Sequence, residues 1–217
     1  MFRVCGNGTL TKQLADKGYS VLGIDASEEM LSLARSEYPQ LDFQCEDATT
    51  FKPEEKVDAV FSNAVFHWID EQKQDALIAN VSSWLRPKGE LVCEFGGYHC
   101  AEAVHSTLEK MFAERGIIYP RTFYFPTIGQ YAPLLEKHNL RVEAALLFDR
   151  PTPQKSEHGV IDWINMFVTK PFEGMEENIK SEILTATEHA LKDKLFIDGK
   201  WFIDYVRIRI RARKIEM

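Results

Sequence analysis

The chain has 217 residues, of which 45% are apolar and 27% are charged, a size and composition that suit one globular domain. This composition excludes a collagen, a disulfide-stabilised miniprotein and a disordered chain. No apolar run approaches the ~18 residues of a membrane-spanning helix, and the first residues contain no secretion signal, so we expect a cytoplasmic protein without a membrane partner. The net charge of −7 argues against nonspecific binding to nucleic acid.

The cysteines and histidines are too scattered to indicate a metal site. Cys5, Cys45, Cys93 and Cys100 lack the spacing of metal ligands, and the six histidines show no zinc pattern. We therefore expect free thiols and no bound metal.

The first half of the chain alternates short apolar runs with helical patterns, which is typical of a parallel sheet with crossover helices. Strands are expected at 19–25, 41–45, 57–62 and 90–95. Ser27 is a candidate N-cap for a helix that buries Met30. Asp70 is expected to cap a second helix, whose apolar residues recur at helical spacing.

The pattern changes after Gly96-Gly97. Within a single domain, 1–217, we predict a lid insertion at 96–140 and a second insertion at 149–195. A strand is expected at 142–148, and a long final strand from Trp201 to Ile210 is expected to pair with it.

Four arginines at alternate positions are predicted to form the solvent-exposed face of the last strand: Arg207, Arg209, Arg211 and Arg213. Nucleic-acid binding by these arginines is the less favoured interpretation.

A glycine turn opens the chain and leads into a helix. Gly6-Asn7-Gly8 lets the backbone approach a ligand closely, and free N–H groups at the start of a helix favour polar or anionic ligand atoms. An ordinary turn remains the alternative.

Acidic and polar side chains follow the next three expected strands. Asp25 ends the first of these, where a nucleotide-binding domain places a carboxylate for ribose hydroxyls; a simple helix cap is the alternative. Asp47 follows the next strand as a candidate acceptor for an adenine amino group, or as an exposed loop acid. Ser62 and Asn63 end the third strand at the expected ligand crevice.

These motifs together resemble those of the class I S-adenosylmethionine-dependent methyltransferases. Gly6-Asn7-Gly8, Asp25, Asp47-Ala48 and Ser62-Asn63-Ala64 occur in the order of that family, each after a strand. The stretch from Ser62 to Trp68 resembles the trans-aconitate methyltransferase-like branch. So do Phe125-Pro126-Thr127-Ile128 and Phe148-Asp149-Arg150-Pro151-Thr152-Pro153.

The resemblance implies a Rossmann-like, doubly wound α/β fold and S-adenosylmethionine as the cofactor. The implied sheet has seven mostly parallel strands in the order 3-2-1-4-5-7-6, with the last strand antiparallel and with helical lid insertions. The residues implied to bind the cofactor are Gly6, Asn7, Gly8, Asp25, Ala26, Met30, Asp47, Ala48 and Asn63. Among them, Asp25 is implied to hold the ribose hydroxyls, Met30 to lie beside the adenine, and Asn63 to lie near the methionine ammonium.

The chain departs from the family pattern at its start. The pattern acid-x-Gly-Cys-Gly-x-Gly would place Phe2 at the acid and Val4 at the first glycine. The family's first helix and most of its central strand would precede Met1. We therefore expect a misassigned start or a shortened chain, with Met1–Val4 filling the place of the central strand and with weakened cofactor binding.

Fewer residues are candidates for contact with the methyl acceptor than for contact with the cofactor. His67 and Trp68 are predicted to line the pocket of the methyl acceptor, with His67 as a base for a hydroxyl or amine; a core position for Trp68 is the alternative. In the predicted lid, Tyr98, His99, Arg121 and Tyr124 are candidate donors to a carboxylate. Arg121 is the charged candidate, because a planar guanidinium suits a carboxylate.

The expected function is methyl transfer to a small-molecule acceptor, with a carboxylate suggested by the branch. One alternative is a noncatalytic or impaired cofactor-binding protein of the same fold. Another is a nicotinamide-dependent oxidoreductase, against which the absence of a full Gly-x-Gly-x-x-Gly argues. We expect a monomer, with a dimer as the alternative.

Overall fold

The computed structural model describes residues 1–4 and 6–216. Cys5, one of the four expected free thiols, lies outside these residues. The other three cysteines are free thiols, with Cys45 exposed and Cys93 and Cys100 buried.

The described residues form a seven-stranded sheet with the strand order β3-β2-β1-β4-β5-β10-β6. Its strands are β1 (Phe2–Val4), β2 (Leu22–Asp25), β3 (Asp42–Cys45), β4 (Val57–Asn63), β5 (Leu85–Gly96), β6 (Leu140–Asp149) and β10 (Val206–Lys214). The first five strands pair in parallel, and β10 pairs antiparallel with β5 and β6. The predicted sheet, including its antiparallel last strand, is confirmed.

The three residues of β1 occupy the centre of this sheet. Phe2 is aligned with Leu22 of β2 on one side and with Val60 of β4 on the other. The chain therefore enters the glycine turn directly from the middle strand, as expected for Met1–Val4.

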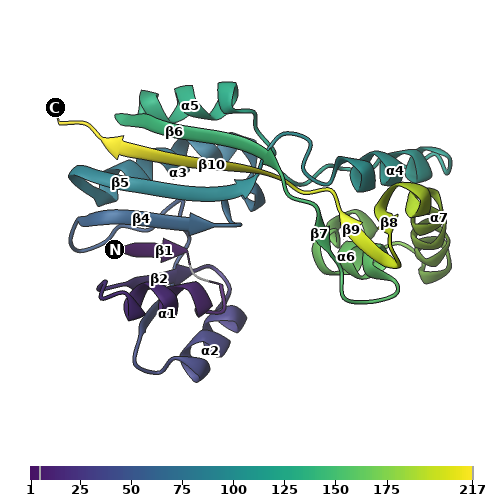
Figure 1. Ribbon diagram of the computed structural model, residues 1–217, viewed down its shortest axis with the longest axis horizontal. Helices are drawn as coiled ribbons and strands as arrows, with labels where there is room; N and C mark the ends of the chain where they lie inside the picture. Colours follow the sequence, from purple (N-terminus) through teal and green to yellow (C-terminus); the bar gives the residue numbers. More distant parts are fainter. Residues whose placement is uncertain (5, 217) are drawn as a thin grey trace.

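Two groups of helices accompany the strands (Figure 1). The helices are α1 (Thr9–Asp16), α2 (Glu28–Glu37), α3 (Gln74–Trp84), α4 (Glu102–Ala113), α5 (Ile128–Lys137), α6 (Gly159–Phe167) and α7 (Glu177–Leu195). Short 3₁₀ turns are η1 (Phe66–Trp68), η2 (Glu71–Lys73) and η3 (Lys170–Phe172).

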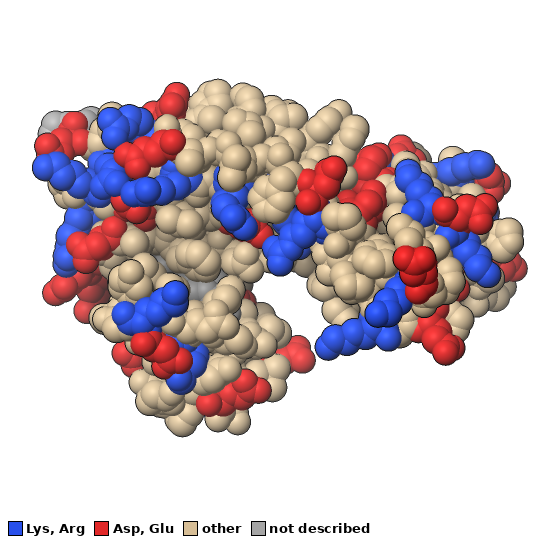
Figure 2. Space-filling view, in the orientation of Figure 1, with Lys and Arg blue, Asp and Glu red and all other residues tan. Residues whose placement is uncertain are grey.

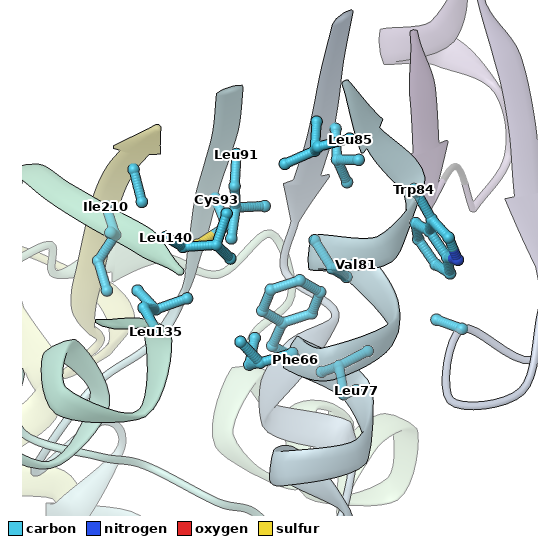
Figure 3. Close-up of a cluster of buried hydrophobic side chains, with 14 of the residues drawn as sticks. Phe66, Leu77, Val81, Trp84, Leu85, Leu91, Cys93, Leu135, Leu140 and Ile210 are labelled. Atoms are coloured by element: carbon cyan, nitrogen blue, oxygen red, sulfur yellow. The ribbon is translucent and has the colours of Figure 1, made fainter. Parts of the chain in front are cut away.

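The main core lies between the sheet and helices α3 and α5 (Figure 3). Leu77 and Val81 of α3 and Leu135 of α5 are buried with Cys93 of β5 and Ile210 of β10. Helix α3 begins at Gln74 after Lys73, and the side chain of Asp70 makes no cap hydrogen bond, so the predicted cap at Asp70 is wrong. The short turn η2, inserted after Asp70, displaces the start of the helix.

A second hydrophobic cluster joins α4, α6 and α7 to β9 (Lys200–Ile203). Strand β9 lies between β7 (Thr152–Pro153) and β8 (Phe196–Ile197) in a small separate sheet. Figure 1 shows these elements gathered beside the large sheet. The segment 96–140 divides between the two clusters, because α4 belongs to the second while α5 packs in the first.

The predicted single strand from Trp201 to Ile210 is divided in two. Strand β9 ends at Ile203 and β10 begins at Val206, and only β10 pairs with β6. At the crossing, Oδ2 of Asp204 accepts a hydrogen bond from the N–H of Ala103, 2.8 Å away. The strand is divided because its two halves bury their side chains in different clusters.

None of the helices formed by residues 1–4 and 6–216 is long and apolar enough to cross a lipid bilayer.

Candidate active site

A cavity of about 820 Å³ lies at the carboxyl ends of β1 to β4. Its lining comes from the loops that follow these strands and from α1, α2, η1 and η2. The lining residues are Gly6, Asn7, Leu10, Asp25, Ala26, Ser27, Met30, Glu46, Asp47, Ala48, Thr49, Asn63, Ala64, Val65, Trp68, Ile69, Asp70 and Lys73. The cavity therefore contains every residue predicted to bind the cofactor except Gly8.

The carboxylate of Asp25 joins the glycine turn to helix α2. Its Oδ2 accepts a hydrogen bond from the N–H of Gly6, 2.8 Å away, and its Oδ1 accepts one from the N–H of Ser27 at 3.0 Å. Ser27 caps α2, since its hydroxyl accepts a hydrogen bond from the N–H of Met30. The cap is therefore supplied by Ser27, and Asp25 stands in front of it at the cavity wall.

Gly8 serves the packing of the glycine turn instead of lining the cavity. Its φ of 81° lies in the left-handed region that favours glycine. A Cβ on Gly8 would lie 3.0 Å from side-chain atoms of Ala34, Phe43 and Tyr38. The missing side chain lets the start of α1 approach α2 and β3.

Asp47 is held by the residue two positions further along the chain. Its Oδ1 accepts hydrogen bonds from the backbone N–H and the hydroxyl of Thr49, both at 2.7 Å. These two bonds lower the pKa of Asp47, and the charge of Lys73 lowers it further. The carboxylate is therefore ionised and fixed in orientation at the cavity wall.

The chain leaves β4 through a strained backbone. Ala64 has a φ of 58°, an uncommon conformation for a residue with a Cβ. Its N–H donates a hydrogen bond to the carbonyl of Glu94, 2.7 Å away. This turn sets Asn63, Ala64 and Val65 side by side along the cavity wall.

Gln74 fixes the turn that carries Trp68. Its buried side-chain N–H₂ donates to the carbonyls of Phe66 at 2.8 Å and Ile69 at 2.7 Å, and its Oε1 accepts from the hydroxyl of Tyr131 at 2.9 Å. Trp68 is 48% exposed, and its ring contacts Phe123 at 4.7 Å between centroids. The indole of Trp68 thus forms part of the cavity wall, and the buried side chain of Gln74 fixes the turn that carries it.

His67 is buried behind Trp68 and is not among the cavity lining. Its Nδ1 accepts a hydrogen bond from the N–H of Gly96, 3.2 Å away, which leaves the proton of the neutral ring on Nε2. Burial, assisted by the charge of Arg207, lowers the pKa of His67 to about 3. The free lone pair that a general base requires is therefore occupied, and the arrangement does not favour the predicted base.

None of the four lid candidates, which are Tyr98, His99, Arg121 and Tyr124, lines the cavity either. Arg121 donates to both carboxylate oxygens of Glu102, at 2.7 and 2.8 Å, and to Glu109 at 3.1 Å, so its charge is already compensated. Tyr98 is exposed on the surface and stacks on His99. Tyr124 packs against the main core.

Several lining residues were not predicted from the sequence to line a ligand site. They are Thr49, Val65, Ile69, Asp70 and Lys73, and all of them follow predicted strands. The spacing of Thr49 from Asp47 was a usable signal, because an Asp side chain commonly accepts a hydrogen bond two residues on. The others reach the cavity only because η1 and η2 fold back toward it.

Comparisons with known proteins agree with this arrangement. A family profile described as a methyltransferase domain matches residues 4–89. An uncharacterised methyltransferase of Schizosaccharomyces pombe is 32% identical over 97% of this chain and 84% of its own length. A trans-aconitate 2-methyltransferase of Variovorax paradoxus is 27% identical over the same shares of the two chains.

The fold agrees as well. The structure of a magnesium protoporphyrin IX methyltransferase from Synechocystis matches with a TM-score of 0.61 over 98% of this chain and 72% of that one, at 15% identity. Neither the noncatalytic nor the nicotinamide alternative is favoured by these comparisons. The chain belongs to the class I S-adenosylmethionine-dependent methyltransferases, and S-adenosylmethionine is its cofactor.

Proposed function

We propose that this methyltransferase holds S-adenosylmethionine in the cavity at the carboxyl ends of β1 to β4 and methylates a carboxylate oxygen of a small acceptor. The second cluster, built from α4, α6, α7 and β9, acts as the lid over the acceptor.

The cavity residues fit this cofactor in chemistry and in size. A volume of about 820 Å³ lies in the ~300–1,000 Å³ range of small-molecule sites. Asp25 offers carboxylate oxygens to the ribose hydroxyls, and Asp47 offers one to the adenine amino group. Met30 supplies apolar contact for the adenine ring, and Asn63 lies at the end of β4 for the methionine ammonium.

The remaining predicted residues act through their backbone or through packing. Gly6 and Asn7 present the backbone of the glycine turn, and Ala26 and Ala48 border the cavity without bulky side chains. Gly8 keeps the turn in place through its contact with α2.

The acceptor is placed on the side of Trp68. When bound, the cofactor supplies a methyl group on a sulfonium sulfur. The sulfur is the leaving group and keeps the electron pair of the bond that breaks. The chain's own contribution is to orient the acceptor and to exclude water. Trp68 joins the cavity to the lid, because its ring contacts Phe123 and Phe167.

The hydrogen bond between His67 and Gly96 supports a carboxylate as the methyl acceptor. A hydroxyl or an amine must lose a proton during methylation and needs a base. The Nδ1 lone pair of His67 accepts a hydrogen bond from the N–H of Gly96. Carboxylate oxygens of Asp25 and Asp47 likewise accept hydrogen bonds from backbone N–H groups. A carboxylate acceptor has already lost its proton at neutral pH, so it needs no base.

The similarity to trans-aconitate 2-methyltransferases supports the same class of acceptor. The name of the relative from Variovorax paradoxus states an acid as the methyl acceptor. We extend to this chain only the class of the acceptor.

The test uses methyl-labelled S-adenosylmethionine with matched acceptors. trans-Aconitate and other small carboxylic acids are compared with their primary amides and with the corresponding alcohols. We expect label in the acids, in a form that mild base releases as a methyl ester does. Methylation of the alcohols or amides, with the acids untouched, would contradict the proposal.

A further inference from the structure

Arg207 stands at the junction of the sheet and the lid. It is the second residue of β10 and is aligned with Gly96, the last residue of β5. The N–H of Gly96 donates to His67, the neighbour of Trp68 in the chain. Arg207 therefore lies beside the residue that holds His67, at the same end of the sheet as the turn that carries Trp68.

Arg207 differs from the three other arginines of its strand. All four lie opposite the buried Ile208, Ile210 and Ala212, so they share one face of the sheet. Arg209 pairs with Glu94, and Arg211 and Arg213 pair with Glu90 and Glu143. Within residues 1–4 and 6–216, no acidic side chain lies within 4.0 Å of the Arg207 guanidinium, and its side chain donates no hydrogen bond.

The surroundings of Arg207 leave its donors free for a ligand. The guanidinium carbon lies 4.4 Å from the centre of the Tyr205 ring, so the cation rests on an aromatic face. Stacking uses the flat face of a guanidinium and leaves the in-plane N–H groups available for a planar carboxylate. Arg207 is half-buried, and a partly desolvated cation without a counterion is unfavourable.

A chain of aromatic rings connects Arg207 to the cavity. Tyr205 accepts a hydrogen bond from Nε1 of Trp163, whose ring contacts Phe167 at 5.7 Å. Phe167 contacts Trp68 at 6.1 Å, and Trp68 lines the cavity. Figure 2 shows a hollow between the sheet and the lid, with Lys and Arg side chains along its upper edge.

We propose that the Arg207 guanidinium binds a second carboxylate of the acceptor, one that is not methylated, and so selects dicarboxylic or tricarboxylic acids. This inference rests on the proposed function. It adds that Arg207 recognises the acceptor and that the acceptor has at least two carboxylates. Pairing with a cation would weaken the nucleophilicity of the reacting oxygen. A guanidinium is therefore better suited to the carboxylate that only positions the acceptor.

The test compares Arg207→Gln with Arg209→Gln, which lies on the same face of the same strand but pairs with Glu94. Each is assayed with trans-aconitate, and with fumarate and succinate beside their monoamides, which keep only one carboxylate. We expect Arg207→Gln to raise the KM for the acids about 10- to 100-fold, with a smaller change in kcat. Arg209→Gln should leave the KM within about twofold. The wild type should use the monoamides as poorly as Arg207→Gln uses the acids.

Equal KM values for the two variants, or a wild type that uses acids and monoamides equally, would overturn the role of Arg207 alone. If no acid is methylated, the proposed function fails. The role of Arg207 is then decided by calorimetric binding of fumarate in the presence of S-adenosylhomocysteine: weaker binding in Arg207→Gln only supports it, and equal or absent binding overturns it. Should Arg207→Gln not fold, Arg207→Lys is compared with Arg209→Lys, and the same differences are expected at smaller size.

Discussion

The N–H of Gly6 donates a hydrogen bond to Oδ2 of Asp25 across 2.8 Å, so the glycine turn after β1 is tied to the end of β2. Oδ1 of the same carboxylate accepts from Ser27 at the start of α2. One side chain thus holds together two of the loops that line the cavity.

This relationship predicts the effect of replacing Asp25. Asp25→Ala leaves the N–H groups of Gly6 and Ser27 without this acceptor and removes the proposed ribose ligand. We expect the affinity for S-adenosylmethionine to fall at least tenfold and the free energy of unfolding to fall by ~1–3 kcal/mol. Calorimetric titration and urea denaturation measure the two effects. Asp58→Ala, at an exposed ion pair with Arg86, should change neither by much, and unchanged affinity in Asp25→Ala would remove Asp25 from the site.

Gly8 and Gly174 form a matched pair of substitutions. Both have positive φ, but a Cβ on Gly174 would meet nothing within 4 Å, whereas one on Gly8 would lie 3.0 Å from three side chains. We expect Gly174→Ala to cost ~1–2 kcal/mol of stability from the backbone alone. Gly8→Ala should cost ~2–4 kcal/mol, because overpacking adds to the same strain. Equal losses in thermal or chemical denaturation would contradict the packing role of Gly8.

Tyr131 affects the cavity without lining it. Tyr131→Phe removes the donor to Oε1 of Gln74, whose side chain holds the turn of Trp68. We expect the free energy of unfolding to fall by ~1–3 kcal/mol, because a buried acceptor loses its partner. The tryptophan fluorescence, to which Trp68 contributes, and the KM for the acceptor should change with it. Tyr98→Phe, at an exposed tyrosine, is the control and should change none of the three measurements.

Two buried histidines predict how stability depends on pH. Burial lowers the pKa of His67 to about 3 and that of His105 to about 4, below the unfolded value of 6.5. Below pH 6.5 the unfolded chain therefore binds protons that the folded chain does not, and stability falls as the pH falls. Each histidine contributes a slope of up to ~1.4 kcal/mol per pH unit between about pH 6 and pH 4.5.

One exposed histidine acts in the opposite direction. Glu188 raises the pKa of His158, so protonation of His158 favours the folded state and offsets a small part of the loss. Denaturation at pH 7.5, 6.0 and 5.0 measures the net slope. His67→Asn and His105→Asn should each reduce it, and a slope that neither changes would show that these rings do not remain neutral.

The sequence alone determined much of the fold and of the cavity. Apolar periodicity is local, so the parallel strands of the first half could be located from it, and the resemblance supplied their order. The glycine turn, Asp25, Asp47 and Asn63 follow strand ends, and parallel strands present their carboxyl ends at one edge of the sheet. Eight of the nine predicted cofactor residues therefore line a single cavity.

Only the tertiary structure decided which charges and lone pairs are free. Arg121 forms ion pairs with Glu102 and Glu109, and the Nδ1 lone pair of His67 accepts a hydrogen bond from Gly96. Neither interaction can be predicted from the local sequence. The arginines of β10 follow one alternating pattern, yet Arg209 is aligned with Glu94 while Arg207 is aligned with Gly96. Their difference arises from strand register, which brings together residues more than a hundred positions apart in the chain.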